Sequence, residues 1–305
     1  MKSYILLIPC GMSNGRMERS MNILEIKDLN KEYKGFSLKN INLTIPAGYI
    51  FGFVGQNGAG KTSTINMINH ICKYKKGTIK VNGITYDENP VKYKESIAYV
   101  GDESYFVKGM KVKAVKKTLK DFYKTFDEEK FDSLIEKYGL PMNKKIDNFS
   151  RGMKVKLMFA TVFSRDSKLM ILDEATNGLD PVVRDELLSD LQAYIENGNR
   201  SILFSTHVLS DLEEIADYIA FIDNGEILLD KPKDEMVEDY LVIKGDINAL
   251  TEEQKKYLIG LDKKPYGFEA IIKSEDVEKI GGQFTYDKPE IAQIMLHSIK
   301  DRRNQ

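Results

Sequence analysis

The chain has 305 residues, of which 42% are hydrophobic and 30% are charged. That is enough apolar material for about two folded domains of about 150 residues each, and it excludes a disordered or fibrous chain. The 45 basic and 46 acidic side chains leave a formal net charge of −1, so we expect no nucleic-acid partner. Two cysteines, Cys10 and Cys72, cannot build a disulfide framework, which is typical of a reducing compartment. No apolar run approaches the ~18 residues that span a bilayer, which excludes a channel or carrier made of this chain alone.

Residues 1–20 differ in pattern from the residues that follow them. Their apolar stretch, residues 4–8, is shorter than the ~7–15 residues of a signal peptide's apolar core. The sequence Leu7-Ile8-Pro9-Cys10 matches a lipoprotein cleavage box only in part, because Pro9 stands where a small residue is required. We therefore expect either a disordered leader or a start codon assigned too early, with the true start at Met21.

Strands and helices alternate from Met21 to about residue 232. Alternating or continuously apolar runs predict strands, and the dipeptides Asn82-Gly83 and Asn224-Gly225 predict hairpin turns. Apolar residues three or four positions apart predict helix over 110–140, and helix is also predicted over 61–71. The predicted strands and hairpins cover residues 22–26, 36–45, 49–54, 78–84, 97–100, 169–172, 201–204 and 219–229. Such alternation is typical of a mainly parallel sheet with helices on both faces.

The pattern changes near Lys231-Pro232-Lys233. Beyond these residues, short apolar runs predict alternating strands and helices, at 240–243, 251–259, 268–272 and 289–300. We expect a small α+β accessory domain over 233–305, without any recognisable catalytic spacing.

The strongest motif is Gly55-Gln56-Asn57-Gly58-Ala59-Gly60-Lys61-Thr62, which matches GxxxxGK[ST] and lies between a predicted buried strand and a predicted helix. Its glycines allow successive backbone N–H groups to point at phosphate oxygens, and the helix N-terminus adds partial positive charge. We expect Lys61 to reach the β- and γ-phosphates and the Thr62 hydroxyl to bind Mg²⁺. The alternative is a glycine turn between a strand and a helix that binds nothing. The expected nucleotide-binding residues are Gly55, Asn57, Gly58, Ala59, Gly60, Lys61, Thr62 and Ser63.

A second motif lies 112 positions after Lys61, where the apolar run 169–172 ends in Asp173-Glu174. A buried parallel strand that ends in a carboxylate places Asp173 at the same sheet edge as the glycine-rich loop. Asp173 can then hold Mg²⁺, and Glu174 can polarise the attacking water. Alone, such a run could equally be a strand that ends in a solvated turn.

Together these motifs resemble the ATP-binding cassette (ABC) ATPases, and the resemblance covers about residues 21–230. Phe149-Ser150-Arg151-Gly152-Met153 resembles the family's Leu-Ser-Gly-Gly-Gln signature. Residues 175–181, which contain Asp180, follow Glu174 as the family's D-loop does. The fold class implied is a P-loop NTPase of ABC type: a mainly parallel core sheet, an antiparallel β subdomain and a helical subdomain at about 103–165.

Two further residues carry the resemblance. His207 ends the strand after Glu174, as the family's switch histidine does, and is implied to sense the γ-phosphate; otherwise it is a structural histidine. Tyr33 lies 28 residues before Lys61, where the family has an aromatic ring that stacks on adenine; otherwise it is a core or edge-strand aromatic.

The signature implies a partner subunit. Ser150 opens a helix, so its hydroxyl, the Gly152 backbone and the helix dipole can meet a γ-phosphate, which in the family belongs to the second subunit. One phosphate loop and one signature per chain imply a head-to-tail dimer with two complete sites. The resemblance implies Ser150, Arg151, Gly152 and Asp180 as nucleotide-binding residues, with Ser150 and Gly152 contacting the nucleotide of the second subunit.

The chain departs from the family pattern at two places. The family usually has Gln where this chain has Asp102, which could ligate Mg²⁺ or could repel the γ-phosphate. In the signature, Arg151 and Met153 replace the usual Gly and Gln, and Arg151 adds positive charge near a phosphate. This form of the signature resembles cassettes of drug, antibiotic and peptide exporters.

The resemblance therefore implies an ATP-hydrolysing subunit of an ABC transporter that powers export through separate membrane permease subunits, with ATP and Mg²⁺ as ligands. It would be cytoplasmic and bound to the inner face of the cell membrane. The alternatives are a soluble ABC-type ATPase acting on the ribosome or DNA, and a regulatory module that binds ATP without turnover. A run of lysines is either a solvated helix face or a face near a membrane partner or anionic lipid headgroups: Lys108, Lys111, Lys113, Lys116, Lys117, Lys120 and Lys124.

Overall fold

The structure is a computed structural model that describes residues 21–281 and 283–304. The predicted leader, residues 1–20, lies outside the described residues. Within those residues, none of the helices combines the length and the apolar character that a membrane crossing requires.

The central element is a six-stranded sheet whose strand order is β5-β6-β7-β3-β8-β9. Neighbouring strands from β5 to β8 pair in parallel, and only β9 is antiparallel, because it returns from β8 through a tight turn at Asn224-Gly225. β3, β6 and β7 are buried at every position, which explains their continuously apolar sequences. The strands are β3 (Ile50–Val54), β5 (Ile97–Gly101), β6 (Leu169–Asp173), β7 (Ser201–Ser205), β8 (Tyr218–Asp223) and β9 (Glu226–Pro232).

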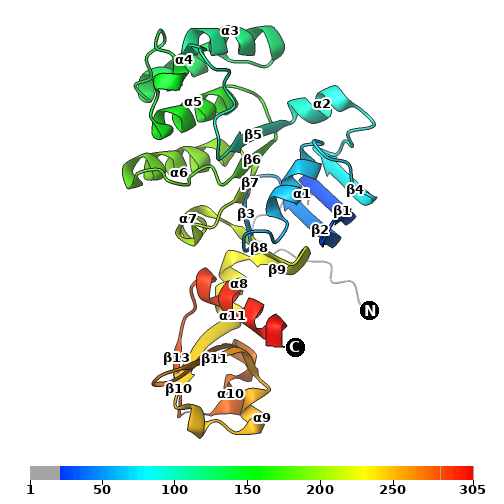
Figure 1. The fold of residues 1–305 in the computed structure, drawn as a ribbon, viewed down its shortest axis with the longest axis vertical. Helices are drawn as coiled ribbons and strands as arrows, with labels where there is room; N and C mark the ends of the chain where they lie inside the picture. The colour runs from blue at the N-terminus through cyan, green and yellow to red at the C-terminus, as the bar shows by residue number, and fades with distance from the viewer. Residues whose placement is uncertain (1–20, 282, 305) are drawn as a thin grey trace, which may run out of the picture.

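A second, antiparallel sheet has the order β2-β1-β4. Its strands are β1 (Asn22–Tyr33), β2 (Phe36–Pro46) and β4 (Lys76–Val81). Helix α1 (Lys61–Ile68) shares one hydrophobic cluster with this sheet and with one face of the central sheet, in which Ile26, Phe53 and Ile65 are all fully buried. Figure 1 shows α1 beside β1, β2 and β4.

Helices form a separate layer on the other face of the central sheet, with α3, α4 and α5 together at one end of the molecule (Figure 1). A second hydrophobic cluster joins this layer to the sheet, and its large members include Phe159 and Phe204. The helices of this layer are α3 (Val112–Phe122), α4 (Glu128–Lys137), the 3-10 turn η1 (Ile146–Asn148), α5 (Arg151–Phe163), α6 (Pro181–Ile195) and α7 (Leu209–Ile215). Helix α2 (Pro90–Glu95) lies on the side of α1, where its buried Tyr93 joins the first hydrophobic cluster.

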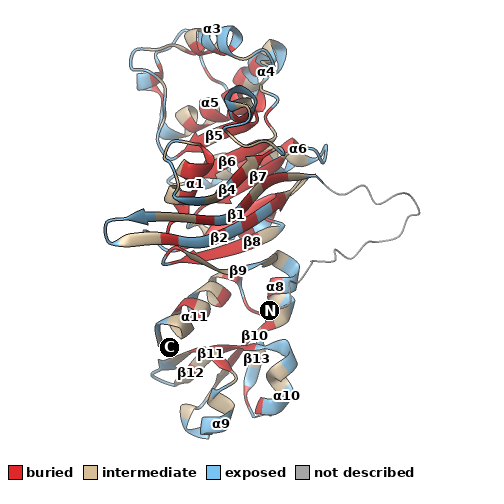
Figure 2. Cartoon of the chain, turned by 90° about the vertical axis from the view of Figure 1, so that its right-hand side faces the viewer, coloured by how far each residue is buried: buried red, intermediate tan, exposed pale blue. Residues whose placement is uncertain are grey.

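The rest of the chain contains a third sheet, antiparallel and ordered β11-β12-β10-β13, with its own buried cluster around Ile243, Phe268 and Ile272. In Figure 2 this sheet lies below the β8–β9 hairpin, and α11 lies between them. The elements are α8 (Lys233–Asp239), β10 (Tyr240–Gly245), η2 (Ile247–Ala249), α9 (Glu252–Lys255), β11 (Leu258–Lys264), β12 (Gly267–Lys273), η3 (Ser274–Asp276), α10 (Val277–Ile280), β13 (Thr285–Asp287) and α11 (Ile291–Asn304).

The expected fold class, a mainly parallel α/β core with antiparallel and helical parts, is confirmed. Four local predictions were wrong. The helix over 110–140 is two helices, because Asp127 caps a new one, and the helix after the glycine-rich loop ends at Ile68. The turn Asn82-Gly83 closes one isolated bridge, Val81 to Ile84, instead of a hairpin, and β11 replaces the second half of the helix expected over 251–259.

The turn glycines Gly225 and Gly83 allow a matched stability test. Both have positive φ, 77° and 76°, but a Cβ on Gly225 would lie 2.0 Å from the carbonyl oxygen of Ser37, whereas nothing lies within 4 Å of one on Gly83. We expect Gly83→Ala to lower the free energy of unfolding by about 1 kcal/mol through backbone strain alone. Gly225→Ala should lower it by about 2–4 kcal/mol, because the clash adds to the strain. Urea unfolding of both variants measures this, and equal losses would contradict it.

Candidate functional site

The glycine-rich loop joins β3 to α1, as predicted, and its glycines are required by close packing. A Cβ on Gly55 would lie 2.3 Å from the carbonyl oxygen of Ile222, and one on Gly60 would lie 2.5 Å from Leu38 Cδ2. Gly60 precedes α1 with φ 117°, which an L side chain rarely adopts. Gln56, Asn57 and Gly58 form the exposed crest of the loop.

Lys61 lies under this crest with a side chain that is only 6% exposed. Its ammonium donates to the carbonyl oxygens of Gly55 at 2.6 Å and Gln56 at 3.3 Å, and lies 4.0 Å from Glu174 Oε1. Burial lowers the pKa of Lys61, while the carboxylates of Glu174 and Asp173 raise it again in part. The loop therefore holds a cation at the position where phosphate oxygens would arrive.

Asp173 is the last residue of β6 and is 7% exposed. Burial raises the pKa of this carboxyl, and the hydroxyls of Ser205 and Thr62 counteract the rise. Its Oδ1 is buried without a hydrogen-bond partner in the described part of the chain. A buried carboxylate with one oxygen lacking a hydrogen-bond partner, and with a threonine hydroxyl close enough to lower its pKa, is a donor set that fits Mg²⁺.

Glu174 is held in an unusual conformation, with φ 56°. Its backbone N–H donates to the carbonyl oxygen of Ser205 at 2.8 Å. Its Oε2 lies 2.7 Å from His207 Nδ1 and accepts from the His207 backbone N–H at 3.2 Å. A strained non-glycine residue is stable only where its surroundings fix it, and such residues cluster at active sites.

The structure adds one side chain to this group that the sequence analysis did not single out. Asn177 donates from Nδ2 to Glu174 Oε2 at 3.1 Å, and the same nitrogen lies 3.5 Å from His207 Nδ1. Glu174 Oε2 thus has three polar neighbours, while Oε1 faces Lys61. In the sequence, Asn177 could have been identified as a candidate site residue because it lies three residues after the candidate catalytic carboxylate Glu174.

Ser150 and Asp180 both cap helices. Ser150 Oγ accepts from the Met153 backbone N–H at 3.2 Å before α5, and Asp180 Oδ1 accepts from the Val183 N–H at 3.1 Å before α6. In Figure 1, α5 lies in the helical layer, away from α1. No hydrogen bond or ion pair that involves residues 21–281 or 283–304 joins the signature to the phosphate loop of the same chain.

The two departures from the family pattern contact each other. The guanidinium of Arg151 pairs with the carboxylate of Asp102, which follows β5. Both side chains are about half exposed, at 47% and 49%. Asp102 thus balances the charge of the signature arginine, and this engagement competes with the Mg²⁺ contact expected of it.

Tyr33 is the last residue of β1, before the turn to β2, and is 40% exposed. Its hydroxyl lies 3.6 Å from Cys72 Sγ, and its ring lies 6.3 Å from that of Phe36. Burial and the neighbouring Cys72 thiol raise the pKa of Tyr33, and the Ser63 hydroxyl opposes the rise. The Lys31 ammonium lies 5.4 Å from the centroid of the Tyr33 ring.

Known proteins share both sequence and fold with this chain. A family model described as "ABC transporter" matches residues 38–177. The ABC transporter ATP-binding protein YtrB of Bacillus subtilis is 30% identical over 262 residues, which are 84% of this chain and 89% of that protein. The chain belongs to the ABC transporter ATP-binding proteins. The lantibiotic transport ATP-binding protein SrtF of Streptococcus pyogenes is 32% identical over 70% of this chain and 92% of its own length. A solved ATP-binding subunit of an ABC transporter has a TM-score of 0.66 at 27% identity, covering 70% of this chain and 91% of that chain.

Membership of this family gives the site its general chemistry, since ABC ATP-binding proteins bind ATP and have ATPase activity. The structure brings five predicted residues together at one sheet edge, namely Lys61, Thr62, Asp173, Glu174 and His207.

The Arg151–Asp102 pair can be tested with a double-mutant cycle. We expect Arg151→Ala and Asp102→Gln to be non-additive, with a coupling free energy of about 0.2–1 kcal/mol, as measured for exposed ion pairs. Lys154→Ala is the matched control, because Lys154 lines the same hollow as Asp102; its cycle with Asp102→Gln should be additive. Urea unfolding measures all the variants, and full additivity between Arg151 and Asp102 would contradict the pairing.

Proposed function

We propose that this chain is the ATP-hydrolysing subunit of an ABC exporter and that Glu174 activates the attacking water. The observation that carries the proposal is the position of the Glu174 carboxylate, held by His207 and facing Lys61 at the end of the strand beside the phosphate loop. A general base must be held within hydrogen-bond reach of the water it activates, and this carboxylate is fixed from two sides. Lys61 stabilises the charge that spreads over the transferred phosphoryl group.

The same proposal assigns the remaining residues around the nucleotide. The backbone N–H groups of Gly55–Ser63 bind phosphate, and Tyr33 stacks on the adenine ring. Thr62 and Asp173 would hold Mg²⁺, which would neutralise charge on the β- and γ-phosphates. In the described part of the chain, no group of three or more His, Cys, Asp or Glu side chains could hold a metal ion, so the phosphates would complete the coordination.

A second subunit completes the site in this proposal. Ser150 lies at the N-terminus of the 13-residue helix α5, where backbone N–H groups and the helix dipole favour an anion. Within residues 21–281 and 283–304, that helix end makes no hydrogen bond or ion pair with its own phosphate loop. We therefore assign Ser150, Arg151, Gly152 and Asp180 to the partner's nucleotide in a head-to-tail dimer.

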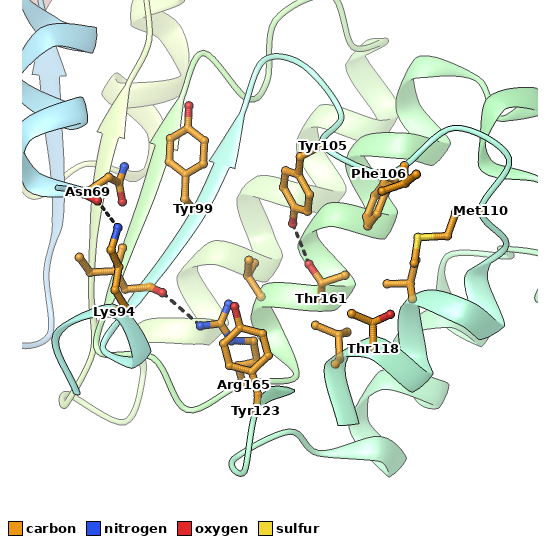
Figure 3. Close-up of a pocket in the computed structure, with 15 residues that line it drawn as sticks. Asn69, Lys94, Tyr99, Tyr105, Phe106, Met110, Thr118, Tyr123, Thr161 and Arg165 are labelled. Atoms are coloured by element: carbon orange, nitrogen blue, oxygen red, sulfur yellow. Dashed lines mark hydrogen bonds between the residues drawn. The ribbon is translucent and has the colours of Figure 1, made fainter. Parts of the chain in front are cut away.

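The permease subunits would contact the pocket in Figure 3. This cavity, about 430 Å³, lies between β5 and the helical layer and is lined mainly by apolar and aromatic side chains, among them Tyr105, Phe106 and Val107. Val107 is 71% exposed and Tyr105 is 51% exposed.

Two members of the lysine run, Lys116 and Lys120, form ion pairs with carboxylates of α4. These two lysines therefore join α3 to α4 within the helical layer.

We further propose that the chain divides near Pro232 into a cassette over 21–232, with its helical subdomain at about 103–165, and an accessory domain over 233–305. The cassette would work at the cytoplasmic face of the cell membrane. Export is supported by the likeness to SrtF and to a bacitracin transport ATP-binding protein, BcrA of Bacillus licheniformis, which is 30% identical over 70% of this chain.

Glu174→Gln tests the catalytic role. The amide cannot accept the proton of the water, so we expect ATP turnover to fall by about 10²–10⁴-fold while ATP binding persists. The variant should accumulate as an ATP-bound dimer in size-exclusion chromatography. Glu214→Gln, at an exposed position of α7, is the control and should keep wild-type turnover. Unchanged turnover in Glu174→Gln would remove Glu174 from this role.

Val107→Asp tests the permease contact. A charge on the exposed apolar lining of this pocket costs desolvation when a partner covers it, so the variant should lose co-purification with membranes. Val182→Asp, 77% exposed on α6, is the control and should remain membrane-associated. Circular dichroism checks that both variants are folded. Wild-type protein that stays with ribosomes instead of membranes would refute the transport proposal.

A further inference from the structure

The last helix of the chain reaches the phosphate loop. Arg303, near the end of α11, donates from Nη2 to the side-chain oxygen Oε1 of Gln56 at 2.8 Å. Gln56 is the second residue of the loop and lies 247 positions earlier in the sequence. α11 belongs to the part of the chain beyond Pro232, and Figures 1 and 2 show it directly below the β8–β9 hairpin.

The neighbouring arginine holds the turn that supports the same loop. Arg302 donates from Nη1 to the carbonyl oxygen of Asp223 at 3.1 Å and pairs through Nη2 with the Glu226 carboxylate. Between these residues, the Gly225 backbone N–H donates to the carbonyl oxygen of Ala59 at 2.9 Å. α11 therefore holds the loop directly at Gln56 and indirectly through the β8–β9 turn.

The other end of α11 is bonded to α7. The backbone N–H of Ile291 donates to Glu213 Oε1 at 2.9 Å. Glu213 lies in α7, which begins at Leu209, two residues after His207. A 14-residue helix fixed at both ends thus spans from the histidine segment to the phosphate loop.

We propose that α11 positions the nucleotide site and that Arg303 increases ATP affinity by holding Gln56. This inference rests on the proposed ATP-binding function and gives residues 233–305 a role in it. The main-chain oxygen of Gln56 accepts from Lys61 Nζ and from the Ala59 N–H. When Lys61 turns to a phosphate, that oxygen loses its lysine donor, and Arg303 continues to hold the residue. A loop ordered before binding loses less conformational freedom on binding.

The test measures equilibrium ATP binding by dialysis with the full chain in a Glu174→Gln background, which avoids turnover. Arg303→Ala and Gln56→Ala should each raise the Kd for ATP about three- to fivefold, the effect of one exposed charge-assisted hydrogen bond. The double variant should be no weaker than the weaker single variant. Arg303→Lys keeps a donor and should bind more tightly than Arg303→Ala.

Lys300→Ala is the matched control. Lys300 lies three residues earlier on α11 and pairs with Asp262 at 2.6 Å, so its loss removes the same charge without touching the loop. Its Kd should equal that of the parent. As an independent measurement without nucleotide, amide hydrogen exchange of residues 56–60 should be faster in Arg303→Ala than in Lys300→Ala.

An unchanged or lower Kd in Arg303→Ala overturns the inference, since the contact would then be irrelevant or inhibitory. So does an equal loss in Lys300→Ala, which would indicate a long-range charge effect, or strict additivity of Arg303→Ala and Gln56→Ala. Failure of the parent chain to bind ATP would refute the proposed function instead, so the two failures are distinguishable. If Arg303→Ala does not fold, Gln56→Ala compared with the parent decides the question.

Discussion

The arrangement of the site depends on the parallel pairing of β6, β7 and β3. Asp173 is in register with Ser205, and β7 pairs on its other side with β3, which leads into the phosphate loop. Because these strands run in the same direction, their ends meet at one edge, and residues that follow them come together there. A slip of one residue would turn Asp173 to the other face of the sheet. The relative positions of Lys61, Asp173 and His207 are therefore fixed by backbone hydrogen bonds.

Several locally unfavourable features are concentrated at the sheet edge that carries Lys61, Asp173 and His207. Glu174 has positive φ, Asp173 is a buried carboxyl with one oxygen unpaired by the described residues, and Lys61 is a buried ammonium. Each costs folding free energy, on the order of 1–3 kcal/mol for a strained backbone or an unpaired buried polar atom. The surrounding fully buried strands hold these residues in place. Departures from local preference that are concentrated at one place are typical of functional sites.

The sequence predicts the site better than it predicts the details of the helical layer and the accessory region. The glycine-rich loop and the acidic strand end were recognisable because each chemical role needs particular residue types at fixed spacing. In contrast, nothing local indicates that the helix around Val115 ends at Phe122, since only the cap at Asp127 separates two stretches of similar periodicity. β11 was missed because its strand character comes from pairing with β12. The contacts of Arg151 and Arg303 join residues 49 and 247 positions from their partners, and a sequence pattern contains no signal for such distances.

The hydrogen bonds of Lys61 have a consequence for which anions can enter the loop. Its ammonium already has two carbonyl acceptors and a carboxylate nearby, so an incoming anion must replace interactions that the chain makes with itself. A single inorganic phosphate offers few oxygens for that exchange. A triphosphate can occupy the backbone N–H groups of the loop while it draws the lysine away. In the proposed function, an anion that enters the loop therefore exchanges with contacts that Lys61 makes within the chain, before any part of the nucleotide base is recognised.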